Sequence, residues 1–162
     1  MTRRNVSTQD QLEKAVSQFD YLKTLEVKDR TARYTMHAIQ LGDRSPTLVV
    51  RPATEANKPY FNTLLKRARS YASQLQANAV NESMLVENRN EDRAMYPEFI
   101  VVGWEDVVDA KGKAVEFTKE ACTDFLKSLP NWLFDDLRAF CGKPTSFLEA
   151  SVSVNAETAG KN

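Results

Sequence analysis

The stretch of residues 96–147 constrains the fold of this chain most, because it concentrates the large apolar side chains. It contains both tryptophans, both cysteines and most of the aromatic rings. Its second half predicts one helix from a Thr118 cap to Ser128, then Pro130 as a stop, and a second helix from an Asn131 cap to Cys141, with Gly142 just beyond its end. Two short helices cannot bury so many large apolar side chains between themselves. We therefore expect the pair to pack against the rest of the chain or against a partner.

A small β-hairpin is predicted immediately before this helical pair, over residues 105–117. Asp109 and Gly112 occupy the first and fourth positions of its turn, which is the pattern of a type I turn followed by a left-handed glycine. A helix is expected before the hairpin, from about residue 87 to residue 102. Pro97 lies inside that helix and predicts a break or kink beside it.

Short alternations of apolar and polar residues in the first third of the chain predict strands. Residues 21–27, 33–41 and 47–51 are expected to form a small antiparallel sheet with short connections. Thr54 then caps a long helix over residues 54–78. Its apolar residues recur every three or four positions, which predicts one buried stripe.

The fold class predicted from these elements is α+β, with a small N-terminal antiparallel sheet followed by a mostly helical C-terminal part with a short β-hairpin. At 162 residues the chain is long enough to bury a real core. We expect a polar N-terminal segment over residues 1–18, a single domain over 19–149 and a flexible tail over 150–162. Within the domain, the predicted parts are strands over 19–52, the long helix over 54–78 and a helical unit over 87–148.

Composition argues against several classes of protein. No apolar run approaches the roughly 18 residues that a membrane span needs, and the N-terminal sequence MTRRNVSTQDQ lacks the apolar core of a secretory signal. We therefore expect the chain in the cytoplasm of the cell that makes it. Cys122 and Cys141 fall on the apolar sides of predicted helices, which favours two buried thiols over a disulfide. No phosphate-binding, dinucleotide-binding, nucleophile-elbow or zinc-protease motif occurs, so we expect no cofactor and no metal.

His37 is the single histidine of the chain, and it lies inside the predicted strand 33–41. A strand histidine is more often a packed or surface residue than a catalytic base, and no serine or cysteine nucleophile motif lies near it. We therefore expect that the protein is not an enzyme. A small enzyme that uses His37 with a carboxylate remains a minor alternative.

Charge is balanced overall but unevenly distributed along the chain. Residues 51–69 carry five basic and one acidic side chain, whereas residues 82–136 carry thirteen acidic and six basic ones. Lys66, Arg67 and Arg69 crowd one part of the long helix and are candidate partner-binding residues for an acidic partner. An ordinary solvated helix face is favoured over a surface that binds an acidic partner. Three bases are too few to predict nucleic-acid binding, although a steep salt dependence of DNA affinity would reveal it.

The sequence VVGWEDVVDAKGKAVEFTKEACTDFLKSLPNWLFDDLRAF resembles a pattern in small proteins of tailed-phage and prophage morphogenesis modules. In that pattern a helix ends at Gly-Trp, an acidic D-x-x-G turn follows, V-x-F-T opens a helix, and L-P precedes a helix rich in aromatic residues and aspartate. The lead-in NRNEDRAMYPEFIV also resembles that family. The resemblance covers roughly residues 88–148, and more weakly residues 51–65. These proteins are tail assembly chaperones or closely related tail-module proteins.

This resemblance implies a non-catalytic protein that binds other proteins. A tail assembly chaperone coats the long helical tape measure protein in the host cytoplasm, keeps it soluble and recruits tail tube subunits, which displace it. Such a role requires an apolar or mixed groove that accepts an amphipathic helix. Large aromatic residues dominate interface energetics, so the candidate anchors are Trp104, Trp132, Phe134 and Phe140. For each ring taken singly, a place in the core is the more common fate.

A structural virion protein of the tail, neck or capsid surface is the main alternative. The same aromatic unit would then serve as a permanent subunit interface. A chaperone is expected to be absent from purified virions, whereas a structural protein is expected there in a fixed copy number. A homo-oligomer is compatible with either role.

Overall fold

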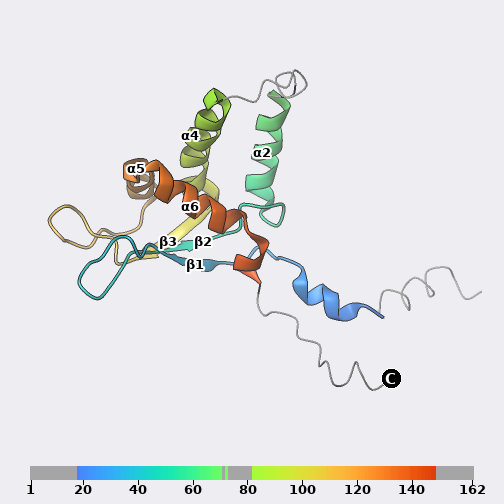
Figure 1. Cartoon of the computed structure of the whole chain (residues 1–162), viewed down its shortest axis with the longest axis horizontal. Coiled ribbons are helices and arrows are strands. Elements are labelled where there is room, and N and C mark those ends of the chain that lie inside the picture. The colour runs from blue at the N-terminus through green and yellow to red at the C-terminus, as the bar shows by residue number, and fades with distance from the viewer. Residues whose placement is uncertain (1–17, 71, 73–81, 149–162) are drawn as a thin grey trace, which may run out of the picture. The chain divides into compact units, whose positions relative to one another are not determined.

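A computed structural model describes residues 18–70, 72 and 82–148 of the chain (Figure 1). The chain divides into two compact units, of which one is Lys28–Phe147. The other unit is represented by residues 18–27 and 148, and it contains the short 3₁₀ helix η1 (Asp20–Leu25). Except for residue 18, the predicted polar segment 1–18 and tail 150–162 lie outside the described residues.

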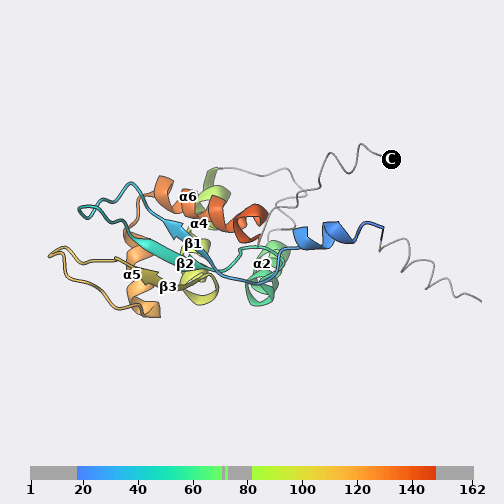
Figure 2. The same cartoon turned by 90° about the horizontal axis from the view of Figure 1, so that it is seen from below.

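All the strands and α-helices that are described belong to the unit Lys28–Phe147, and they make it an α+β structure, as predicted. In chain order the elements are β1 (Ala32–Thr35), β2 (Thr47–Val50), α2 (Lys58–Ser70), α4 (Glu82–Phe99), β3 (Val101–Glu105), α5 (Lys119–Ser128), α6 (Asn131–Gly142) and the 3₁₀ helix η2 (Pro144–Phe147). Helices α4, α5 and α6 lie on one side of the sheet, and α2 stands beyond the ends of the strands (Figures 1 and 2).

The sheet has three antiparallel strands in the order β1-β2-β3, but its third strand is not the one predicted. The predicted strand 21–27 contains η1 instead. The third strand is β3, which starts inside the range predicted as helix 87–102. Val101 and Val102 are β-branched, and Val101 pairs with Val50 of β2, so the strand is favoured over one more helical turn.

Strand β1 is shorter than the predicted strand 33–41, because the chain turns away after Thr35. The backbone N–H of Met36 donates to the carbonyl of Pro46 at 2.8 Å, and the N–H of Ile39 donates back to Met36 at 3.0 Å. His37 therefore lies exposed in a turn and not in a strand.

Helix α4 runs through Pro97 to Phe99, so the break predicted at this proline is wrong. A proline in the last turn removes only one hydrogen bond of the helix, to the carbonyl four residues earlier. The next bond is kept, since the N–H of Ile100 donates to the carbonyl of Tyr96 at 3.0 Å.

Helix α2 starts later than predicted and is capped by a different residue. The hydroxyl of Thr54 accepts from the N–H of Ala56 at 3.3 Å, which closes a turn before the helix. Asn57 takes the cap position, because its carbonyl accepts from the N–H of Phe61 at 2.9 Å. The expected end of this helix, at residue 78, lies outside the described residues.

The predicted turn before α5 and the predicted cap of α5 are confirmed, whereas the predicted caps at the two ends of α6 are wrong. Gly112 has a positive φ of 79°, and its N–H donates to the carbonyl of Asp109 at 3.0 Å, as the predicted hairpin turn requires. The hydroxyl of Thr118 accepts from the N–H of Ala121 at 3.0 Å and caps α5. Asn131 is instead the first residue of α6, and its side chain does not cap that helix. Gly142 is the last helical residue, with Lys143 as the cap.

The core lies between the sheet and the helices that cover it. Leu48 and Val50 of β2, Ile100, Phe134 and Leu137 each expose none of their surface. Both cysteines are free and fully buried, as predicted. Burial raises the pKa of the Cys122 thiol to about 12, and it raises the pKa of Cys141 as well. Both thiols are therefore protonated at neutral pH and act as small core residues.

Candidate protein-binding groove

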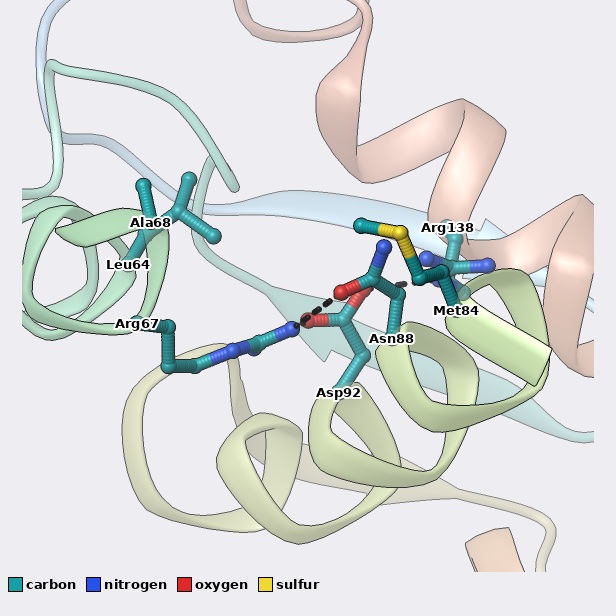
Figure 3. A pocket seen from close by; sticks show the side chains of 7 residues that line it. All are labelled: Leu64, Arg67, Ala68, Met84, Asn88, Asp92 and Arg138. Carbon is teal, nitrogen blue, oxygen red and sulfur yellow. Dashed lines mark hydrogen bonds and ion pairs between the residues drawn. The ribbon is translucent and has the colours of Figure 1, made fainter. Parts of the chain in front are cut away.

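A cavity of about 300 Å³ is lined by side chains of α2, α4 and α6 (Figure 3). Leu64 and Ala68 of α2 and Met84 of α4 give it apolar walls. Its polar lining consists of Arg67, Asn88, Asp92 and Arg138. We call this cavity and its lining residues the α2–α4 groove. Its volume is at the lower end of the range in which binding pockets occur.

Asp92 is the centre of the polar lining and is buried. Its Oδ1 accepts a hydrogen bond from Nη1 of Arg67 at 3.2 Å, and its Oδ2 accepts one from Nε of Arg138 at 2.8 Å. Figure 3 shows Arg67 reaching from α2 towards Asp92 on α4, with Arg138 approaching Asp92 from α6. A buried carboxylate is tolerated only when it is paired, and here both of its oxygens are used.

These contacts belong to a longer series of ion pairs with alternating sign across three helices. Beyond Arg138 the series continues to Asp135 at 3.2 Å, and from Asp135 to Arg89 at 2.7 Å. At its other end, Nε of Arg67 contacts a carboxylate oxygen of Glu91. The members in order are Glu91, Arg67, Asp92, Arg138, Asp135 and Arg89. Three acids alternate with three bases, so the series carries no net charge and cannot attract a partner of either sign strongly.

Arg67 is the member of the predicted basic group that the structure places in the groove. It also donates from Nη2 to the side-chain oxygen of Asn88 at 3.3 Å. Lys66 and Arg69 are exposed on α2 and do not line the groove. The sequence indicates why Arg67 differs from Lys66 and Arg69. Arg67 lies three residues after Leu64, and this spacing places it beside the apolar stripe of the helix.

The four predicted aromatic anchors are not brought together in the groove. Phe134 belongs to the core and is fully buried. Trp104 is half-buried, and its indole Nε1 donates to the carbonyl of Val115 at 2.9 Å. Phe140 is half-buried, with its ring centroid 5.2 Å from that of Tyr34. Trp132, in the first turn of α6, exposes 62% of its surface and is the most accessible of the four.

Asp135 gives the ion-pair series a measurable pH dependence. The hydrogen bond from Arg89, with a second from Arg138, holds the pKa of the Asp135 carboxyl below its usual value. Its stabilising contribution is thus complete above the unfolded-state pKa of about 4 and is lost as the pH falls through the lower folded-state pKa. We expect the unfolding free energy of Asp135→Asn to fall less steeply below about pH 4 than that of the wild type. Urea denaturation across the acid range measures this, and parallel curves would contradict it.

Across residues 18–70, 72 and 82–148, no group of at least three His, Cys, Asp or Glu side chains is placed to hold a metal ion. In that part of the chain no helix combines the length and the apolar character needed to cross a membrane.

Most of the chain matches a known protein family. Residues 55–161 match the model of the family described as YdaY prophage protein, and this match covers more than half of the chain. The chain belongs to the YdaY prophage protein family. It is therefore a phage-derived protein, as the sequence resemblance implied. Neither the curated proteins nor the solved structures contain a match to the chain.

The YdaY match includes the whole α2–α4 groove. It starts at Glu55, before α2, and extends past the end of α6. All the residues that line the groove, from Leu64 to Arg138, fall inside it. Strands β1 and β2 precede the matched residues. The groove is thus part of the region that defines the family, whereas two of the three strands are not.

Proposed function

We propose that this YdaY-family protein is a tail assembly chaperone that binds the tape measure protein in the host cytoplasm and recruits tail tube subunits. The observation that carries the proposal is the α2–α4 groove, where apolar side chains line a cavity between helices. A groove that combines apolar walls with paired polar side chains can accept an amphipathic helix. The prophage origin of the family and the resemblance of residues 88–148 to tail-module proteins support the same role.

The chemistry of the groove indicates what kind of helix fits it. Leu64, Ala68 and Met84 offer apolar contact to an incoming side chain. Asp92 and its two arginines are already paired, so a charged side chain entering the groove would lose its water without gaining a counter-ion. We expect the bound segment to be an amphipathic helix that inserts uncharged apolar residues. Binding of this kind is reversible and makes no covalent bond.

Co-expression with the tape measure protein and the tail tube protein of the same phage tests this function. We expect the tape measure protein to remain soluble and to copurify with the chain. Leu64→Asp is expected to abolish copurification, because it places a charge on the apolar wall. Leu65→Asp is the matched control, since Leu65 is 43% exposed and lies outside the groove lining. Failure to copurify with either partner, or equal loss in both variants, would overturn the proposal.

A structural virion protein is the second candidate, and the exposure of Trp132 favours it. An exposed tryptophan is a common anchor in permanent interfaces, and this one exposes 62% of its surface in the isolated chain. Purified virions distinguish the two roles. A chaperone is absent from them, whereas a structural protein is present in a fixed number of copies.

A further inference from the structure

Helix α2 is fixed to α4 by buried contacts at its N-terminal end. The side chain of Asn57 is fully buried, and its Nδ2 donates to the carbonyl of Phe99 at 2.9 Å. Tyr60 is also buried, and its ring meets that of Tyr96 edge-on with centroids 6.3 Å apart. These two side chains anchor the start of α2 against the end of α4.

The remainder of α2 has a different kind of contact with α4. Within residues 61–69 every side chain is exposed or only half-buried. Leu64 and Ala68 face the cavity. In the part of α2 that the structure describes, Arg67 makes polar contacts with Asp92, Asn88, Glu91 and the sulfur of Met95. A segment with few buried apolar contacts opens at a low free-energy cost, so this part of α2 depends on Arg67.

We propose that α2 is a hinged flap over the groove, in which Asn57 and Tyr60 form the hinge and Arg67 is the latch. When the Arg67 contacts break, the C-terminal part of α2 moves away from α4 and the cavity widens. The motion belongs to the free protein. Only its use, to admit a partner helix, rests on the proposed function.

Hydrogen exchange of the free protein tests the latch without any partner. In Arg67→Gln, we expect the backbone amides of residues 64–70 to exchange about tenfold faster than in the wild type, while those of α5 and α6 keep their rates. Lys66→Gln is the matched control, because it removes the same charge from an exposed neighbour on the same helix. We expect that variant to exchange like the wild type.

Two outcomes would overturn the flap: unchanged exchange in Arg67→Gln, or an equal acceleration in α2, α5 and α6, which would mean general destabilisation. If Arg67→Gln does not fold, Arg67→Lys decides the question. It keeps the charge but not the forked set of donors, so we expect a local acceleration of about threefold over residues 64–70. No local acceleration there would also overturn the flap. Because no partner is present, this result is independent of the copurification experiment.

Discussion

Replacing Phe134 with alanine is expected to lower the free energy of unfolding by about 3–5 kcal/mol. The ring exposes none of its surface and lies edge-on against Tyr96, with centroids 5.4 Å apart. The guanidinium of Arg93 covers it at 4.6 Å from the ring centroid. Removing the ring leaves a cavity between α4 and α6 that the surrounding elements can close only in part. Urea denaturation of the purified variant measures the loss.

Trp132→Ala is the matched control for this prediction, because the two aromatic residues lie two positions apart on α6. Trp132 exposes 62% of its surface, so we expect its replacement to change stability by no more than about 0.5 kcal/mol. If Phe134→Ala were as stable as Trp132→Ala, the packing described here for α6 would be wrong.

Replacing Arg93 with alanine is expected to cost about 2–4 kcal/mol. This buried arginine of α4 donates to the carbonyls of Leu126 and Leu129 at the end of α5, the latter at 3.0 Å. It also donates to the side-chain oxygen of Asn131 at 2.8 Å, which explains why Asn131 does not cap α6. Without Arg93, these acceptors lose a charged donor near the C-terminal end of a helix, where a positive charge is stabilising.

A lysine at position 93 separates the contribution of charge from that of geometry. Arg93→Lys keeps the positive charge but cannot reach three acceptors in the same planar arrangement. We expect its stability in thermal and urea denaturation to fall between the wild type and Arg93→Ala. Full stability in Arg93→Ala would show that the three acceptors do not need this donor.

Local signals in the sequence predicted the elements whose causes are local. The hairpin turn at Asp109 and the cap at Thr118 depend on residues only a few positions apart, and both are confirmed. The local sequence does not indicate strand β3, because the pattern of Val101 and Val102 is compatible with one more turn of the preceding helix as well as with a strand. Its pairing partner, β2, lies far away in the sequence. The predicted strand 33–41 failed for a similar reason, since alternation alone does not show where a turn ends the pairing.

The groove was harder to predict than the core. Phe134, Leu137 and Cys141 are spaced by three and four residues, which places them on one buried side of α6, while Trp132 lies off that line. That signal was present in the sequence. The contacts of Asp92 with Arg67 and Arg138 join residues 25 and 46 positions apart, on three different helices. No periodicity encodes such pairings, because they depend on how the helices pack.

Binding of a tape measure segment in the α2–α4 groove is tested most directly by chemical-shift mapping of the labelled chain with fragments of that protein. We predict that the largest shifts occur at Leu64, Ala68 and Met84, and that Leu64→Asp abolishes them. Shifts confined to the hairpin around Gly112 or to the strands, with the groove unaffected, would contradict a groove that holds a partner helix.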